Sequence, residues 1–390
     1  MVAIGLLDIP PEIQLQIARF VETSKTLKAL SVTCRSFRSI AQSLIFESLR
    51  IDLEKSLRGP IDDLLANPQI CAAIRSLELR GGYLPPTEDE KLSFMEKLSL
   101  IQKLLPEMVG LRGVWIYQHV TLSTAFTSSL LEVAAKIPLS FKLGSNVYPS
   151  GISSMPSAPL RISHFRFGAI DQASLDFYRM VFHASAATLT ELNVRANGDG
   201  LRHLVNIDLP CLHTFLLFIT VDSELARASA AAFITVQRTI QVLDLNQKVC
   251  PLPPLPPSAL PDLRELHGPT QLVNQLVPGR PVEVIYLNPS QESGRDWFGE
   301  EVTRSTTRVR RLRVHLKDTI LKTPMVKRMV TITPYLESLW LSVLADVSSP
   351  FAYDHLDSFP IRHSSMLLKF SLPSSTSRTY ASFCTVAEHG

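Results

Sequence analysis

Side chains that could carry out catalysis are scattered along this chain without the spacing that catalysis needs. Ten histidines and five cysteines occur among 390 residues. The histidines nearest one another in the sequence, without the spacing of metal ligands, are His164, His183, His203 and His213. The chain lacks a GK[ST] phosphate loop, a GxGxxG turn, an HExxH helix and a GxSxG elbow. The sequence therefore predicts no catalytic residue, metal or cofactor, and a protein that is not an enzyme.

Two further features with possible chemistry have simpler explanations. The segment Asn197-Gly-Asp-Gly200 lacks the additional carboxylates of a calcium loop and predicts a turn. Cys34 lies on the apolar stripe of a predicted helix, which favours a buried thiol over a nucleophile. The five cysteines are far apart and form no CxxC pair, a pattern typical of reduced thiols. We therefore expect a protein of the cytoplasm, the nucleus or both.

Charge and hydropathy exclude two kinds of partner. A net charge of +3 is too small to indicate nucleic acid by itself. The N-terminus has no basic region before an apolar run, so we expect no signal peptide. No apolar run approaches the ~20 residues of a membrane helix. We expect neither nucleic acid nor a membrane as a partner.

The segment from Leu6 to Phe46 predicts two or three short amphipathic helices. Pro10 and Pro11 suit the first turn of a helix, where a missing N–H is tolerated. A first apolar stripe consists of Ile13, Ile17 and Phe20 or Val21, and a second of Leu27, Leu30, Cys34, Phe37, Ile40, Ala41 and Leu44. So small a module usually needs a neighbour or a partner to complete its hydrophobic burial.

This segment resembles an F-box. The ordered anchors are Ile9-Pro10-Pro11-Glu12-Ile13, then Leu27, then Leu30-Ser31-Val32-Thr33-Cys34-Arg35-Ser36-Phe37-Arg38. Departures are small: Ile9 stands where leucine is commoner and Phe37 where tryptophan is common. The resemblance implies docking onto the Skp-type adaptor of a cullin-based ubiquitin ligase. It also implies a set of residues that line or support that contact: Pro10, Pro11, Ile13, Ile17, Leu30, Val32, Cys34 and Phe37. The alternative is a helical hairpin that caps the remainder of the chain.

Beyond Ile51 a phrase of the form L-x-x-L-x-L recurs, with successive copies mostly about 19–29 residues apart, the leucine-rich-repeat period. Copies begin at Ile74, Leu111, Ile162, Leu189, Leu212, Ile240, Leu263, Val282, Val309 and Leu336. Each predicts a short strand with alternate residues in a shared core. Helices are expected between them at Glu90 to Lys103, Thr127 to Lys136, Asp171 to Ser185, Ser223 to Arg238 and Thr323 to Val330.

The predicted fold is a small all-α module at residues 1–50 followed by an irregular, α/β leucine-rich-repeat-like solenoid at 51–370. Only Asn246 and Asn288 occupy the asparagine position of the repeat consensus, so a generic α/β domain is the alternative. The tail at 371–390 is rich in serine and threonine and is expected to be poorly ordered or a capping remnant.

In each predicted strand, the residues between the core positions should form an exposed face. Arginine and aromatic side chains there suit protein binding. The predicted target-binding residues are Trp115, Tyr117, Arg166, Arg195, Tyr286, Arg313 and Trp340. The same face includes Glu78, Arg80, Asn193, Asp244 and His315. The alternative is that loops cover this surface.

Two local features allow a second interpretation. The proline cluster from Pro251 to Pro261 has PxxP spacing that suits an aromatic groove, although a rigid connecting loop is the more ordinary explanation. The basic run of Arg304, Arg308, Arg310, Arg311, Arg313 and Lys317 could attract an acidic or phosphorylated partner, or be a solvated face.

Together these features predict a non-catalytic substrate receptor of an SCF-type (Skp–cullin–F-box) ubiquitin ligase. The N-terminal module would bind the adaptor, and through it a cullin, while the repeats select a target protein. The alternative is a leucine-rich-repeat interaction scaffold without a ubiquitin link, in which the N-terminal helices serve as a cap.

Overall fold

The computed structural model describes most of the chain. The described residues are 9–21, 24–33, 35–55, 58–81, 87–117, 120–144, 147–149, 158–168, 172–196, 201–219, 221, 223–246, 251–287, 300–317, 329, 331–344, 366–371 and 384–386. The chain divides into two compact units, Met1–Arg195 and Ala196–Gly390. The predictions that fall on Cys34, Asn288 and residues 197–200 lie outside the described residues.

The first unit begins with three helices, α1 (Pro11–Arg19), α2 (Ser24–Ser31) and α3 (Arg35–Ile45). The predicted proline start is confirmed, because Pro11 occupies the first turn of α1. A small core forms where α3 contacts α1 and α2. Its buried members are Ala18, Leu27 and Ala41, with Val21, Leu30, Ile40, Leu44 and Ile45 packed against them. The module therefore has a core of its own.

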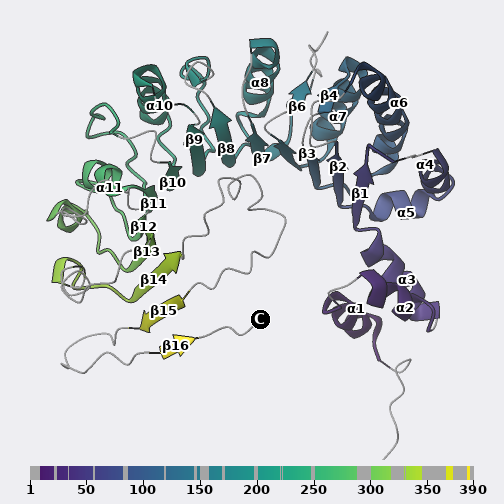
Figure 1. Cartoon of the computed structure of the whole chain (residues 1–390), viewed down its shortest axis with the longest axis horizontal. Coiled ribbons are helices and arrows are strands. Elements are labelled where there is room, and N and C mark those ends of the chain that lie inside the picture. The colour runs from purple at the N-terminus through teal and green to yellow at the C-terminus, as the bar shows by residue number, and fades with distance from the viewer. Residues whose placement is uncertain are drawn as a thin grey trace, which may run out of the picture. The chain divides into compact units, whose positions relative to one another are not determined.

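A parallel sheet follows in the first unit, with helices along one face (Figure 1). Its strands, in order, are β1 (Ser48–Asp52), β2 (Ser76–Arg80), β3 (Gly113–Tyr117), β5 (Leu139–Leu143), β7 (Ile162–Phe167) and β8 (Glu191–Ala196). A separate parallel pair consists of β4 (Val120–Leu122) and β6 (Val147–Pro149). The helices are α4 (Arg58–Leu65), α5 (Pro68–Ala73), α6 (Glu88–Leu104), η2 (Leu105–Glu107), α7 (Thr124–Lys136) and α8 (Gln172–Ser185).

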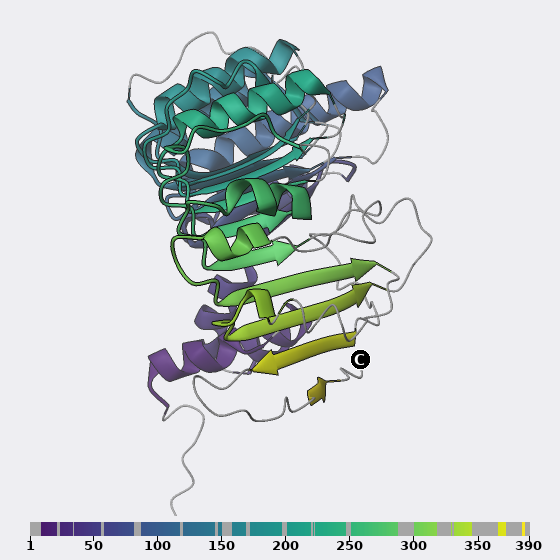
Figure 2. The same cartoon turned by 90° about the vertical axis from the view of Figure 1, so that its left-hand side faces the viewer.

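The second unit also consists of parallel strands with helical segments between them. Its parallel strands are β9 (Thr214–Ile219), β10 (Val242–Leu245), β11 (Glu265–Gly268), β12 (Val284–Leu287), β13 (Arg311–Lys317) and β14 (Ser338–Leu344). Helical segments are α10 (Glu224–Val236), α11 (Thr270–Leu276) and η4 (Glu300–Arg304). Two final strands, β15 (Met366–Ser371) and β16 (Cys384–Val386), pair antiparallel, and Figure 2 shows β15 running against its neighbours. Within the predicted tail at 371–390, only Ser371 and these last three residues are described.

All ten predicted phrases contain a strand, and the four predicted helices that lie within described residues are confirmed. The fifth, Thr323 to Val330, falls almost entirely outside them. The sequence missed β5 because Pro138 occupies the position of the phrase's first apolar residue, opposite Leu111 in the register. It missed β1 because residues 48–50 were assigned to the helical module.

Most strands alternate between core and exterior as predicted, but Glu78 of β2, predicted to lie on the exposed face, is buried. Positions facing the helices are buried, for example Leu77 and Leu79 in β2 or Leu312 and Val314 in β13. Between β7 and α8 the core is aromatic, and the rings of Phe167 and Tyr178 stack with centroids 4.4 Å apart. We call the opposite side of the strands the open face. Its residues are those that alternate with the buried positions.

A repeated hydrogen-bond pattern precedes the strands. The carbonyl of the residue before one strand accepts N–H groups from two successive residues at the start of the next. In the first unit, Arg75 O accepts from Arg112 N at 2.7 Å and Gly113 N at 3.1 Å, as Glu47 O does from Arg75 and Ser76. In the second unit the same pattern recurs with His213, Gln241, Arg264, Glu283 and Arg310 as acceptors. The same backbone geometry is therefore repeated from strand to strand.

The proline cluster is part of the core packing of the second unit. Leu252, Ala259 and Leu260 are buried, and Leu260 adopts a positive φ of 58°. Gln275 donates from Nε2 to Leu252 O at 2.7 Å and to Pro253 O at 3.2 Å. These contacts favour the interpretation as a connecting loop.

Candidate functional site

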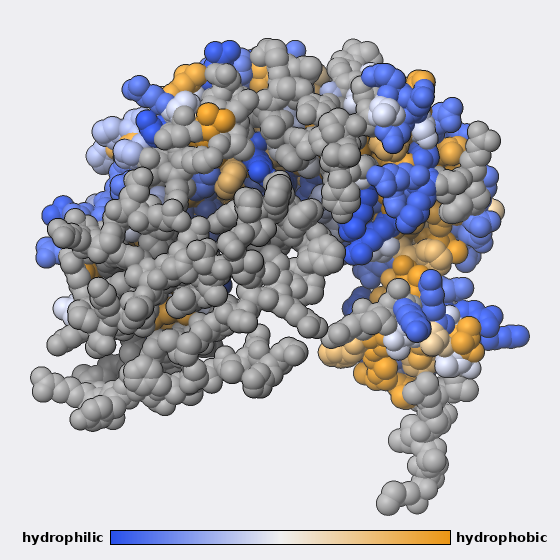
Figure 3. All heavy atoms as spheres, in the orientation of Figure 1, coloured by the Kyte–Doolittle hydropathy of each residue, from blue (hydrophilic) through white to orange (hydrophobic). Residues whose placement is uncertain are grey.

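The N-terminal helices expose a row of large apolar side chains. Ile13, Ile17 and Phe20 have 50%, 39% and 84% of their surface exposed. Their spacing places them on one side of α1. Val32, directly after α2, is 73% exposed. Figure 3 shows hydrophobic atoms gathered over these helices. Pro10 and Pro11 are also exposed, so five of the eight predicted adaptor-binding residues are accessible.

The other side of α1 packs against the module's core. Ala18 is fully buried, and Gln14, 2% exposed, donates from Nε2 to Ile9 O at 2.8 Å. A small residue at position 18 lets α1 approach α3 closely. Because this inner side already completes the core, Ile13, Ile17 and Phe20 are not needed for it.

The remaining predicted adaptor-binding residues have different environments. Phe37 is fully buried, and Leu30 is half-buried against the module's core. These two side chains support the module from inside. Cys34 lies outside the described residues. The structure therefore divides the predicted set into exposed and buried side chains, and contact with the adaptor stays a prediction.

A compact helical module with an outward apolar side is the arrangement of a docking domain. A family model, the F-box domain, matches residues 6–49. Residues 6–49 therefore form an F-box domain, as the sequence predicted. F-box domains bind Skp-type adaptors within SCF complexes, and F-box proteins are typically non-catalytic adaptors. No curated protein matches the chain.

The open face of the first unit carries the predicted residues Trp115, Tyr117, Arg166 and Arg195. Trp115 is half-buried, and Lys142 Nζ lies 5.3 Å from its ring centroid. The indole N–H of Trp115 is buried without a hydrogen-bond partner. Arg166 is exposed, whereas Tyr117 and Arg195 are half-buried. The phase predicted for these strands is therefore confirmed, while their role in binding stays a prediction.

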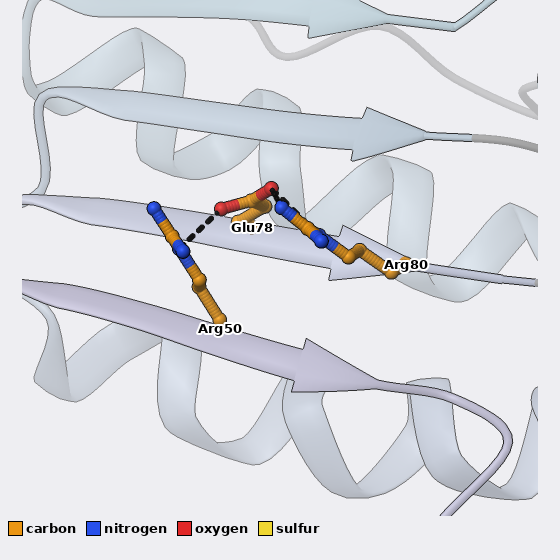
Figure 4. A network of polar contacts seen from close by, with 3 residues as sticks. All are labelled: Arg50, Glu78 and Arg80. Atoms are coloured by element: carbon orange, nitrogen blue, oxygen red, sulfur yellow. Dashed lines mark hydrogen bonds and ion pairs between the residues drawn. The ribbon is translucent and has the colours of Figure 1, made fainter. Parts of the chain in front are cut away.

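Glu78 has a structural role on this face (Figure 4). Its carboxylate, 5% exposed, accepts from Arg50 Nε at 2.8 Å and from Arg80 Nη2 at 2.6 Å. Arg80 Nε reaches the same Oε1 atom at 2.8 Å. Each carboxylate oxygen of Glu78 thus binds a guanidinium group, one from Arg50 on β1 and one from Arg80 on β2. Glu78 joins β1 to β2 and has little capacity left for a partner.

The open face of the second unit carries the predicted residues Tyr286, Arg313 and Trp340, which are half-buried. They are direct neighbours in the register of β12, β13 and β14. The Arg313 guanidinium lies 5.8 Å from the ring centroids of both Tyr286 and Trp340. Trp340 Nε1 donates to Ser338 Oγ at 2.5 Å. The strands therefore place a cation between two aromatic rings.

The sequence analysis missed His267, which lies beside Tyr286 with ring centroids 4.1 Å apart. Its Nε2 is 2.7 Å from Glu265 Oε1, and its Nδ1 is 3.5 Å from Asp244 Oδ2. Burial lowers the pKa of His267, but the two carboxylates outweigh it and raise this pKa to about 9. The signal was weak because Gly268 ends the phrase that begins at Leu263, so the position before it was not counted.

The predicted basic run is divided among different environments. Arg308 stacks on the Tyr335 ring at 4.0 Å, and Arg310 Nη1 lies 3.7 Å from Glu337 Oε1. Arg304 and Arg311 are exposed, and Arg313 lies on the open face. The side chains of His315 and Lys317 lie outside the described part of the structure. The run is therefore not one continuous basic surface.

The part of the chain that the structure describes contains no group of three or more His, Cys, Asp or Glu side chains placed to hold a metal ion. None of the described helices is both long enough and apolar enough to cross a bilayer.

Proposed function

We propose that this chain is the substrate-recognition subunit of an SCF-type ubiquitin ligase and itself performs no chemistry. The outer side of α1 docks onto the Skp-type adaptor, and through it a cullin. The strands form an irregular leucine-rich-repeat solenoid whose open face captures a target protein. The receptor then acts by raising the effective concentration of the target near an enzyme held elsewhere.

The observation that carries this proposal is the apolar row Ile13, Ile17 and Phe20 on the outside of an F-box domain whose core is complete without it. Burying one such side chain at an interface is worth roughly 1.5–3 kcal/mol. An exposed row of this kind has no benefit for an isolated protein. It is the expected surface for a permanent partner.

Two observations support the solenoid. The ten phrases recur as parallel strands that follow one another in chain order within each unit, with β5 inserted between β3 and β7. The repeated carbonyl pattern before the strands indicates that equivalent backbone positions recur in each unit of the chain. Cys71 and Cys211 are thiols and not disulfides, which supports a cytoplasmic or nuclear location, where cysteines stay reduced.

The second candidate is a repeat scaffold in which the helices are a cap. It is favoured by the fully buried Phe37 and by the contact of α3 with α5. Under this hypothesis the helices stabilise the first strands and bind no adaptor.

Co-purification with a Skp-type adaptor distinguishes the substrate-receptor function from the repeat scaffold. The double variant Ile13→Ala/Ile17→Ala should weaken adaptor binding at least about tenfold, because two apolar contacts are lost. A matched control on the same helix is Glu12→Ala/Arg19→Ala, which removes two exposed side chains without changing net charge. The control should bind normally, and neither variant should change the melting temperature of the chain. An intact chain that never co-elutes with the adaptor would refute the receptor function.

A further inference from the structure

Five side chains from five neighbouring strands form one row on the open face of the second unit. In the register, Asp244 of β10 lies opposite His267 of β11, His267 opposite Tyr286 of β12, Tyr286 opposite Arg313 of β13, and Arg313 opposite Trp340 of β14. Adjacent strands are about 4.8 Å apart, so each side chain is in reach of the next. We call this set the cross-strand row.

At one end of the cross-strand row, the charged side chains are paired with one another within the protein. His267 lies between the carboxylates of Asp244 and Glu265, at 3.5 Å and 2.7 Å. Its ring also contacts Tyr286. The imidazolium form is therefore held by two anions, and these anions in turn are partly neutralised. This end of the row has no free cation to offer to a partner.

The other end of the row differs because its cation, Arg313, has no anion beside it within the described part of the chain. Arg313 forms no ion pair with any described residue, and its Nε is shielded from solvent without a hydrogen-bond acceptor. Its contacts are with the rings of Tyr286 and Trp340. By contrast, Arg310, three residues earlier, pairs with Glu337. Arg313 is thus a half-buried guanidinium that contacts two rings and has no charged partner among the described residues.

This combination determines what such a site would bind. A guanidinium held between two rings keeps its plane fixed, so less rotamer freedom is lost when its N–H groups bind a ligand. Two N–H groups of one guanidinium match the two oxygens of a carboxylate. The flanking aromatic rings favour apolar contact on both sides of the charge, as in the centres of protein interfaces. Phosphate recognition usually employs several arginines together. Arg308 and Arg310 are engaged elsewhere, and Arg311, on the same side of β13 as Arg313, is an exposed side chain without the flanking rings.

We propose that Tyr286, Arg313 and Trp340 form a binding site for the carboxylate of an aspartate or glutamate in an extended segment of the target protein. This inference rests on the proposed function, since it assigns the target chemistry to the open face. The carboxylate pairs with Arg313, and the neighbouring part of the segment lies over the two rings.

The test uses the full-length chain, purified with its adaptor, and a bead library of random hexapeptides. The wild-type protein should select peptides with aspartate or glutamate at one position. Replacing that acid by its amide in a selected peptide should weaken binding at least tenfold. Arg313→Gln should weaken the acidic peptide equally and make the protein indifferent to the acid-to-amide change. Arg313→Lys, which keeps the charge but loses the planar fork, should fall between the two.

Arg310→Gln is the matched control, because it removes an exposed guanidinium three residues away that pairs with Glu337, and it should bind like the wild type. Thermal unfolding of all variants shows that none has lost its fold. The proposal is overturned if no peptide is selected, if acid and amide peptides bind equally, or if Arg313→Gln leaves the preference intact. Selection of phosphoserine over both acids, in a parallel library, overturns it as well.

The same preparations keep this proposal distinct from the proposed function. If the chain does not bind the adaptor but still selects acidic peptides through Arg313, only the ubiquitin link is refuted. Normal adaptor binding together with indifference to acidic residues refutes the Arg313 site alone.

Discussion

At the scale of residues, apolar positions of one motif, the F-box, differ in their exposure to solvent. Ile13 and Ile17 are exposed on α1, whereas Phe37 on α3 is fully enclosed. All three belong to the pattern by which the F-box is recognised, and all three are apolar. Composition alone therefore cannot separate a residue that contacts the partner from one that supports the module. Substitutions can make that distinction directly.

Phe37→Ala should destabilise the first unit by about 3–5 kcal/mol, because it leaves a cavity where an aromatic ring was buried. Val32→Ala, at an exposed position, should change stability by less than about 0.5 kcal/mol. Urea unfolding of the two variants provides the measurement. Equal effects would mean that Phe37 is not core. For the same reason, loss of adaptor binding in Phe37→Ala says little about contact unless folding is checked.

His267 should make stability depend on pH. Its pKa in the folded state is raised to about 9, from an ordinary value of 6.5. The folded protein therefore holds this proton more tightly than the unfolded chain does. The resulting stability is fully present below pH 6.5 and is lost as the pH rises towards 9.

Urea midpoints measured between pH 6 and pH 9.5 test this directly. The wild type should lose stability across this window, and His267→Gln should lose less. A slope that is identical in both proteins would show that Asp244 and Glu265 do not hold the proton in the folded state.

At the scale of elements, local sequence specifies where the helices that connect the strands begin. Ser123 precedes α7 and accepts the N–H of Phe126 at 3.2 Å, and Ser223 does the same before α10 with Ala226 at 3.1 Å. Thr87 and Glu90 form a reciprocal capping box at the start of α6. These caps satisfy N–H groups that the helix itself leaves unpaired. They explain why the predicted helices were found close to their predicted starts.

Ser123→Ala should cost about 1 kcal/mol of stability through the loss of this cap. The matched control is Ser128→Ala in the interior of α7, where alanine favours the helix and stability should be unchanged or slightly higher. Thermal or urea unfolding of both variants provides the comparison. If the two substitutions have the same sign, the cap does not contribute as the geometry indicates.

At the scale of the whole molecule, the question is whether the strands depend on the N-terminal helices. The edge strand β1 is joined to β2 by parallel pairing and by the ion pair of Arg50 with Glu78. Glu47 O also accepts two N–H groups at the start of β2. The strand therefore belongs energetically to the sheet, and a truncation that tests the module must leave it in place.

A chain that begins at Glu47 should remain folded and lose adaptor binding. A chain that begins at Leu53 should be less stable, because removal of β1 exposes the edge of β2 and leaves Glu78 with fewer cations. Circular dichroism melting and adaptor co-purification measure both outcomes. Unfolding of the longer truncated chain would instead support the hypothesis that the helices are a cap.

The sequence by itself determined most of the helices and strands and which residues of the predicted strands alternate between the two sides. Helix starts, strand positions and the alternation of buried and exposed residues follow from local spacing, since side chains alternate along a strand and recur about every 3.6 residues along a helix. The order of the F-box anchor residues was likewise evident from the amino-acid sequence. The strand at Leu139–Leu143 escaped because a single proline, Pro138, replaced an apolar residue of the repeated phrase.

Only the tertiary structure decided which apolar face of α1 is inside and which is outside. Both faces carry apolar residues, and the small side chain of Ala18 allows the close packing that turns Ile13 and Ile17 outwards. It also decided the pairing of charges. Both carboxylate oxygens of Glu78 bind Arg50 and Arg80, whereas Arg313 lies between two rings and pairs with no anion of the described residues. The reason is physical: apart from Glu78 and Arg80, which share β2, these neighbours come from different strands, and only the register of the sheet brings them together.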